Sequence, residues 1–374
     1  MRTRSGRGTA RGREVPGREH PPAERQGTPR AVDGHRLVLG KDGRLTAYAR
    51  TDDGLLRWTE ARPGGPEWTG PDFFPVPHLT HLSVTQGADT YVHLVGRREI
   101  RRPDGPPATD VVHAIQYQTG RPVTEWRSLG NPHGEPEKAA RLGAPAAAVS
   151  ASGRVHVLVR NAGGGVMLRR EAPGGKWERW HDLKGSGVHD GLAVLALGSG
   201  RVEVLAGGEN NAMRWRQDEP DGEFRRELNI PVRVAPGSVS VLETAPDRAT
   251  YYWTDPEAGG VVAHRPGGWL IPLGGDPAAA EPVTAVRAVL DGYDCTVLAH
   301  RDAGGEVVLA GFGTENEQSG VWWSPTGEHS GAAPALALDA LGRVVLAVLG
   351  RDGSLRVSRQ TGEPGLSMAP SVTV

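Results

Sequence analysis

Three pairs of neighbouring aromatic and arginine residues occur at one position of a repeated pattern. The pairs are Arg57-Trp58, Arg214-Trp215 and His264-Arg265. Other repeats carry a different residue where these have the aromatic ring: Arg169, Leu309 and Val357. An aromatic ring can stack on the C–H face of a sugar while a guanidinium donates hydrogen bonds to hydroxyls. These six residues are the predicted ligand-binding residues, with no metal or cofactor expected. The alternative is that the rings only fill gaps in the fold.

Catalytic motifs are not evident in the sequence. The stretch from Thr51 to Trp58 approaches the Asp-box of sialidase-type propellers, Ser-x-Asp-x-Gly-x-x-Trp, but its glycine stands one place early and the motif occurs once. We interpret it as a turn. The chain has no nucleophile elbow, phosphate-binding loop or His-Glu-x-x-His motif. The protein is therefore predicted not to be an enzyme.

Histidines and the single cysteine offer little metal chemistry. His78 and His81 make a pair without a third ligand in view, which is a poor metal site. A lone Cys295 excludes an intramolecular disulfide framework and a cysteine-based zinc site. One loop is bracketed by two polar pairs, His181-Asp182 and His189-Asp190. A role for this loop in binding an ion or a hydroxyl-rich ligand is a minor hypothesis, because most polar loop residues have no such role.

The aromatic pairs belong to a repeating unit of four short predicted strands. In residues 144–185, apolar alternation bounded by Gly and Pro predicts three strands at 145–151, 155–160 and 166–171, and a fourth that carries Trp177 and Trp180. The first strand of each unit is short and rich in Ala, Ser and Val. Such a pattern predicts a meander of antiparallel hairpins.

Two series of landmarks count the units. The turn between the first two strands recurs at Arg44, Asp89, Arg154, Arg201, Arg248, Tyr293 and Arg343, in steps of 45, 65, 47, 47, 45 and 50 residues. The fourth strands carry large apolar residues at Trp68, Trp126, Trp180, Phe224, Trp269, Trp323 and, more weakly, Leu366. Both series have seven members. The second unit is longer because of two loop-like insertions, at residues 96–109 and 131–143, of which the first is basic and predicted to be a solvated hairpin tip.

Four strands per unit and a period of 45–50 residues predict an all-β, seven-bladed β-propeller over residues 31–374. Small residues suit the inner strands, which crowd together near the axis of a propeller, and aromatic residues suit the wide gaps between its outer strands. Each blade has too few large apolar residues to stand alone. The core is therefore expected between neighbouring blades, and the ring must close.

Charge and hydropathy exclude some partners. The formal net charge is −1, but residues 1–30 hold eight Arg and three Glu, which leaves −6 on the remainder. Residues 1–30 are predicted to be a disordered basic tail, because they contain almost no large apolar residue. The sequence has no basic stripe with interleaved aromatic residues, so nucleic-acid binding is not predicted. No membrane span or signal peptide is evident, which predicts a cytoplasmic protein, and the Arg, Ala and Gly bias suggests a high-GC bacterial genome.

The ending of several fourth strands resembles a known family. The pattern Trp-x-x-Leu-Gly occurs at residues 126–130, without its glycine at 180–183, and one residue longer at 269–274. It is similar to the blade ending of seven-bladed bacterial lectins typified by the fucose-binding propeller lectin of insect-pathogenic bacteria. The resemblance covers residues 31–374 and implies shallow sugar sites between adjacent blades, usually several weak ones used together. Blades four, six and seven lack the ending, so a full set of equivalent sites is not expected.

Three functions follow from these observations. The first is carbohydrate binding by several weak interblade sites, with a glycan or glycoconjugate as partner. The second is a recognition subunit of a larger bacterial assembly, which would show a contiguous apolar patch. The third is a propeller enzyme, which would need clustered carboxylates at the mouth of the axis. The sugar, the oligomeric state and any partner protein stay open.

Overall fold

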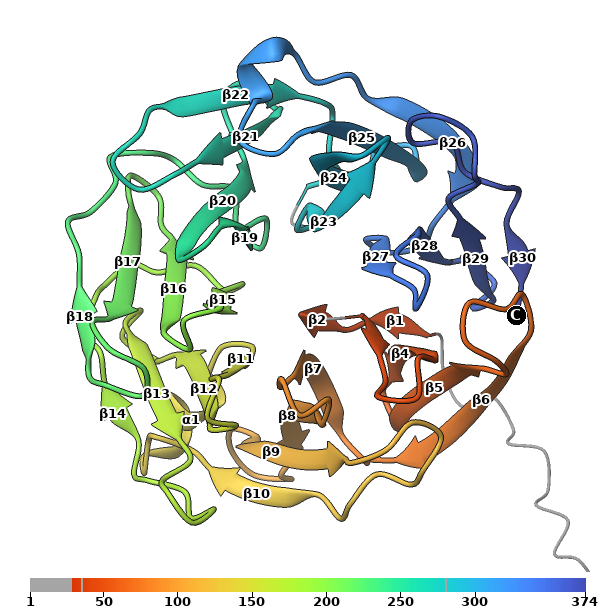
Figure 1. Ribbon diagram of the computed structural model, residues 1–374. Coiled ribbons are helices and arrows are strands. Elements are labelled where there is room, and N and C mark those ends of the chain that lie inside the picture. The colour runs from red at the N-terminus through yellow and green to blue at the C-terminus, as the bar shows by residue number, and fades with distance from the viewer. Residues whose placement is uncertain (1–28, 35, 280) are drawn as a thin grey trace, which may run out of the picture.

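A ring of seven β-sheets surrounds a central axis (Figure 1). The computed structural model describes residues 29–34, 36–279 and 281–374. Each sheet is one blade, and its four consecutive antiparallel strands run in chain order from the axis to the rim. Tight turns join the strands, and glycines such as Gly153 and Gly342, with φ of 82° and 75°, permit the left-handed backbone there. The predicted seven-bladed β-propeller is confirmed.

The first four blades take up residues 37–226. Blade 1 contains β3 (Leu37–Leu39), β4 (Leu45–Thr51), β5 (Gly54–Glu60) and β6 (Trp68–Pro75). Blade 2 contains β7 (Leu79–Gln86), β8 (Val92–Ile100), β9 (Ala108–Gln116) and β10 (Arg127–Gly130). Blade 3 contains β11 (Ala146–Val149), β12 (Val155–Arg160), β13 (Val166–Arg170) and β14 (His181–Asp182). Blade 4 contains β15 (Ala193–Ala196), β16 (Val202–Gly207), β17 (Ala212–Gln217) and β18 (Phe224–Arg226).

The last three blades take up residues 240–373. Blade 5 contains β19 (Ser240–Ala245), β20 (Arg248–Thr254), β21 (Val261–His264) and β22 (Leu270–Gly274). Blade 6 contains β23 (Thr284–Leu290), β24 (Tyr293–Arg301), β25 (Glu306–Gly313) and β26 (Ser324–His329). Blade 7 contains β27 (Ala335–Leu338), β28 (Val344–Leu349), β29 (Leu355–Arg359) and β30 (Val372–Thr373).

Helix is limited to two short segments in the described residues, α1 (Pro136–Ala140) and the single 3₁₀ turn η1 (Glu317–Ser319). Neither is long and apolar enough to cross a membrane. The basic insertion in blade 2 differs from its prediction as a loop. Strands β8 and β9 extend into it at both ends, because their residues pair as far as Ile100 with Ala108, and only the tip between them is irregular.

The core lies between the blades, as predicted. Each of seven apolar clusters joins residues of two adjacent blades. We call each boundary a joint and name it by its two blades. Inner strands such as β11, with the sequence Ala-Ala-Ala-Val, allow the blades to converge at the axis. Side chains near the rim must fill a wider gap, and the composition of each joint therefore decides whether it is closed.

The first and last described segments of the chain meet at joint 7–1 without sharing a sheet. Among the described residues, blade 7 is built only from β27 to β30, while β1 (Arg30–Ala31) pairs with β4 in blade 1. Strand β2 (Asp33–Gly34) runs parallel to β7 in blade 2. Side chains therefore close the ring, including Trp58 packed against blade 7 and the ion pair of Arg359 with buried Glu60. Of the predicted tail, residues 1–28 lie outside the described residues, and Arg30 belongs to β1.

Candidate functional site

Trp58, Trp215 and His264 share one position of the third strand, as predicted from the repeats. Two of the residues that the sequence analysis placed at this same position, Leu309 and Val357, are one residue out of register. Ala310 and Ser358 occupy this position in blades 6 and 7, whereas Leu309 and Val357 face the opposite side of the sheet. Successive side chains of a strand alternate between faces, so a shift of one residue changes the joint that a side chain enters.

The three predicted rings are buried. Trp58, Trp215 and His264 expose 2%, 1% and 6% of their surface. The indole Nε1 of Trp215 donates a hydrogen bond to the backbone oxygen of Leu183, 2.9 Å away in the preceding blade. Burial also lowers the pKa of His264, so this imidazole is neutral at pH 7. Burial favours the gap-filling interpretation of these rings, and their role in ligand binding stays a prediction.

The three predicted arginines are paired within the protein. Arg57 contacts Asp72 at 2.5 Å, and Arg214 contacts Glu203 at 3.1 Å. Arg265 contacts the fully buried carboxylate of Glu317 in blade 6 at 2.7 Å. These ion pairs occupy guanidinium donors that were expected to face hydroxyls. Each ring faces the joint with the preceding blade, whereas the neighbouring arginine faces the joint with the following blade. The structure thus separates each predicted ring from its own arginine.

Indole N–H groups form hydrogen bonds across three of the joints, each to a backbone oxygen of the preceding blade. Trp180, Trp215 and Trp323 donate their Nε1–H to the backbone oxygens of Leu129, Leu183 and Leu273, at 3.3, 2.9 and 2.9 Å. The accepting residues are the leucines of the Trp-x-x-Leu ending, and the residue after each has a φ of 66–70°. In this protein the motif behind the lectin resemblance is therefore part of the contact between blades.

Arginines tie the blades together in two further rows. Three of the five turn arginines of the sequence landmarks reach carboxylates of the next blade, in the pairs Arg154–Asp221, Arg201–Asp247 and Arg248–Glu315. A second row comes from the third strands, in the pairs Arg170–Glu223, Arg265–Glu317 and Arg359–Glu60. The two rows together join blades 3 and 4, 4 and 5, 5 and 6, and 7 and 1, in addition to the apolar packing.

Joint 6–7 departs from this pattern at every one of these positions. Tyr293 stands at the turn position of the series where other blades have arginine, and Gly311 stands at the third-strand arginine position. Thr326 stands where other blades have the leucine, Ser358 where blades 1 and 4 have an indole, and Leu366 where other blades have the outer aromatic. Six of the seven clusters contain at least two Trp, Tyr or Phe residues, whereas the cluster of joint 6–7 contains none. Side chains too small to fill the gap leave it open.

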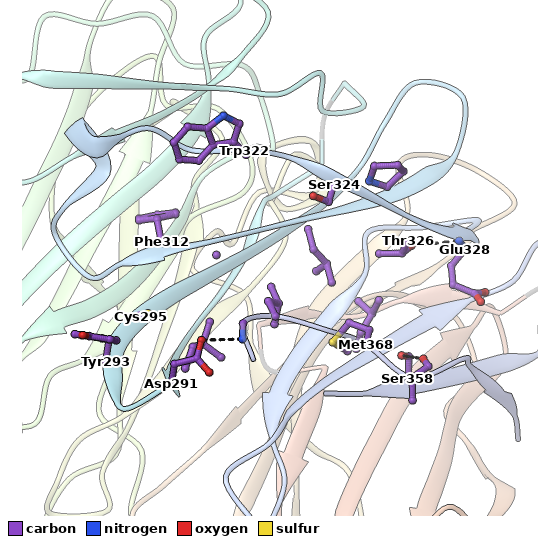
Figure 2. Close-up of a pocket in the computed structure, with 18 of the residues that line it drawn as sticks. Asp291, Tyr293, Cys295, Phe312, Trp322, Ser324, Thr326, Glu328, Ser358 and Met368 are labelled. Atoms are coloured by element: carbon purple, nitrogen blue, oxygen red, sulfur yellow. Dashed lines mark hydrogen bonds between the residues drawn. The ribbon is translucent and has the colours of Figure 1, made fainter. Parts of the chain in front are cut away.

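The open joint is a groove of about 1240 Å³ (Figure 2). Its apolar floor consists of aliphatic and sulfur-containing side chains: Leu290, Cys295, Leu309, Leu346, Leu366 and Met368. Burial raises the pKa of the Cys295 thiol, which therefore stays protonated and acts as apolar surface. Two aromatic rings, Tyr293 and Trp322, line the groove while each exposes 74% of its surface. We take this groove as the candidate functional site.

Polar groups in the groove come from both blades. The Glu328 carboxylate of blade 6 accepts hydrogen bonds from Arg356 of blade 7 at 3.3 Å and from the Ser371 hydroxyl at 2.6 Å. Asp294 accepts from Arg287 and from Thr314, both in blade 6. The hydrogen bond from Arg287 lowers the pKa of Asp294, which is ionised at neutral pH. Fixed acceptors beside exposed rings are suited to binding a ligand that is polar on one side and apolar on the other.

Other residues singled out in the sequence are not gathered into a site. Asp182 pairs with Lys184 and Asp190 with Arg160, so the loop between them has its carboxylates engaged. Within residues 29–34, 36–279 and 281–374, no group of three His, Cys, Asp or Glu side chains is arranged to hold a metal ion. Sequence reasoning missed the groove because its signal is the absence of repeated residues, although Tyr293 and Leu366 were among the exceptions in their series.

Comparisons with solved structures show the same fold in distant proteins. A lectin from Burkholderia pseudomallei superposes with a TM-score of 0.67 at 14% identity, covering 92% of this chain and 99% of the lectin. The periplasmic gluconolactonase of Pseudomonas aeruginosa gives a TM-score of 0.52 at 17% identity, with 90% and 95% covered. A sialidase described as Hadza microbial gives a TM-score of 0.52 at 13% identity, with 83% and 71% covered.

Sequence comparison adds no relative. No protein-family model matches the chain, and no curated protein sequence matches it. At identities of 13–17% the structural likeness establishes the fold alone. The lectin and both enzymes named above share the architecture. The resemblance to propeller lectins is thus confirmed at the level of the fold, and this chain is a seven-bladed propeller of that architecture.

Proposed function

We propose that the protein binds carbohydrate in the groove of joint 6–7. The observation that carries the proposal is the convergence of five departures from the repeat on one joint, where the aromatic filling and both arginine contacts are missing together. Random loss of packing residues would scatter over the ring. A cluster of losses that opens a lined groove instead indicates a binding site.

The chemistry of the groove fits a sugar. Glu328 is held by Arg356 and Ser371, so its carboxylate is positioned before a ligand arrives, and the remaining N–H groups of Arg356 can donate to hydroxyls. The apolar floor can cover the C–H face of a pyranose. Side chains of Glu328 and Arg356 are 19% and 33% exposed, so a bound sugar would shield them from water and strengthen their hydrogen bonds.

This proposal changes the expected number of sites. Indole or phenol rings fill the other joints, so we expect one developed groove to bind the ligand rather than a ring of equivalent sites. Multivalent binding would then need several copies of the protein on one surface. The six residues predicted from the sequence remain a second hypothesis, which places weak sites in the joints beside Trp58, Trp215 and His264.

A glycan array followed by calorimetry tests the proposal. The wild-type protein should bind at least one glycan, and Glu328→Gln should weaken that binding tenfold or more, because hydrogen bonds to a charged group contribute about 1.5–3 kcal/mol. Trp269→Ala is the matched control, since Trp269 is 91% exposed and does not line the groove. An array without any signal, or a Glu328→Gln protein that binds as well as the wild type, would show that the groove does not bind carbohydrate.

A further inference from the structure

Two closed joints place carboxylates of one blade opposite arginines of the blade before it. The carboxylates lie in the loop that precedes the outermost strand, and they form the pairs Arg154–Asp221, Arg170–Glu223, Arg248–Glu315 and Arg265–Glu317. In each joint, one arginine comes from the turn between the first two strands and the other from the end of the third strand. The acidic loop of each joint thus receives its cations from the neighbouring blade.

Joint 6–7 keeps the acidic side of this arrangement and lacks the basic side. The corresponding loop of blade 7, between β29 and β30, contains Glu363. The two arginine positions of blade 6 hold Tyr293 and Gly311 instead. The Glu363 carboxylate accepts a hydrogen bond from the Ser367 hydroxyl at 3.2 Å, and no cationic side chain pairs with it in the described part of the chain. Glu363 is therefore left without the cation that other joints supply.

A second carboxylate at this edge of the groove also lacks a cation. Asp291, in the turn before Tyr293, lines the groove, and its Oδ2 accepts a hydrogen bond from the backbone N–H of Gly365, 2.8 Å away (Figure 2). Within the described residues, no hydrogen bond or ion pair engages its Oδ1. Glu363 precedes Gly365 by two residues, so their Cα atoms are at most about 7 Å apart. The two unpaired carboxylates thus belong to the same part of the groove.

The other charges of the groove are balanced or absent. Glu328 lines the groove and pairs with Arg356. Among the described residues that line the groove, none is Lys, Arg or His. Residues 31–374 carry a formal net charge of −6, which favours the approach of cations over that of anions. The groove therefore has unpaired negative charge and no unpaired positive charge to offer a ligand.

We infer that the groove binds a glycan with free amino groups, and that an ammonium group of this glycan pairs with Asp291 and Glu363 in place of the missing arginines. This inference rests on the proposed carbohydrate binding and adds the chemical class of the ligand. An ammonium group has three N–H donors, and its hydrogen bonds to carboxylates are charge-assisted. An N-acetylated sugar is neutral and cannot supply this charge, and an acidic sugar would bring a carboxylate toward Asp291.

Oligosaccharides that differ only in acetylation test the inference. A tetramer of glucosamine and its fully N-acetylated counterpart are titrated into the full-length protein by calorimetry, at about pH 6 and low ionic strength. The same comparison is made with galactosamine. In the sugar series that binds, the free amine should bind at least about fivefold more tightly than the N-acetylated form. The ratio should fall as salt is added, because salt screens exposed charges.

Substitutions that remove only a charge locate the ammonium group. Asp291→Asn and Glu363→Gln should each reduce the ratio by about threefold, and the double variant should abolish the preference. Asn also tolerates the left-handed backbone of Asp291, whose φ is 51°. Asp104→Asn, at an exposed bend in the insertion of blade 2, is the matched control and should keep the wild-type ratio. Thermal unfolding shows that each variant is folded.

Contrary results separate the inference from the function beneath it. Neutral or acidic glycans that bind as tightly as the free amine would overturn the amino-group preference and leave carbohydrate binding in place. A preference that survives in the double variant would place the ammonium group elsewhere and overturn the inference. A preference that salt does not weaken would show that it does not depend on charge. Absence of binding by every glycan would contradict both proposals.

Discussion

Joint 2–3 and joint 6–7 are built on the same backbone scaffold and differ in what fills them. In joint 2–3, Trp180 donates its indole N–H to Leu129 and packs with Trp177 against blade 2. In joint 6–7 the cluster is aliphatic, and Ser358 and Leu366 leave room for a groove. Hydrogen-bonded strand ladders run within each blade, so the loss of filling at one joint leaves the blades themselves intact. A propeller can therefore open one joint for a ligand while the others hold the ring closed.

The largest effect is expected where a closed joint loses its indole. Trp215→Ala removes a ring that is 1% exposed together with its hydrogen bond to Leu183, and large-to-small substitutions of this kind cost about 3–5 kcal/mol. Urea denaturation should show the loss as a lower midpoint with an unchanged slope. A Trp215→Ala protein of wild-type stability and impaired glycan binding would instead support the site predicted beside Trp215 and contradict the gap-filling role.

The next largest effect is expected for a cross-blade ion pair. Arg265→Ala leaves the fully buried Glu317 carboxylate without its cation, which costs about 3 kcal/mol. Arg287→Ala is the comparison at the groove, because its pair with Asp294 is 39% and 49% exposed and should contribute under about 1 kcal/mol. The two variants are compared by thermal and urea unfolding. Equal losses would show that the cross-blade pair does not hold its joint.

A comparable effect is expected from acid, and it acts through the closed joints. Burial lowers the pKa of His113 to about 3 and of His156 to about 4, while the groove lining contains no histidine. Because the folded pKa values lie below the unfolded value near 6.5, the unfolded chain binds more protons below that pH. The contribution of these histidines to the free energy of unfolding is therefore fully present above about pH 6.5. It falls as the pH drops toward 4, by up to about 1.4 kcal/mol per pH unit for each histidine.

The pH dependence is checked by urea unfolding between pH 7 and pH 4.5. In His156→Gln, the free energy of unfolding should depend less steeply on pH, by an amount that corresponds to about one bound proton. In the folded wild type the His156 imidazole is neutral, because Nδ1 donates to the Arg154 carbonyl oxygen and Nε2 faces the Gln217 amide. A slope identical to that of the wild type would show that His156 titrates normally.

The smallest effect on stability is expected from closing the groove. A Cβ at Gly311 would meet Leu366 and Leu290 at 3.4 and 3.5 Å, which is ordinary contact, so Gly311→Arg should fold normally and fill the groove. Glycan binding should fall more than tenfold with little change in melting temperature. Gly163→Arg, at an exposed turn of blade 3, controls for the added charge. Unimpaired binding by the Gly311→Arg protein would show that the ligand lies at another joint.

Much of the fold could be predicted because it depends on local periodicity. Strand alternation, turn residues and the spacing of turn arginines specify four-stranded units, and seven such units must close into a ring to bury their aromatic residues. The position of the core between blades followed from the same reasoning. The place where a ligand binds is harder to predict from the sequence. Trp58 and Trp215 have the residue type of a sugar-binding ring, but residue type does not reveal whether a ring face is covered by the next blade.

The sequence by itself determined the number of blades, the order of their strands and the positions at which the repeat changes, because these depend on the spacing of residues along the chain. Only the tertiary structure decided which joint each side chain enters. Turn lengths differ between blades, so Ser358 rather than Val357 faces joint 6–7, and strand pairing alone fixes that register. Contacts such as that of Arg356 with Glu328 join residues of different blades. They exist only because closure of the ring brings neighbouring blades together, and the groove between them is the space that their small side chains leave unfilled.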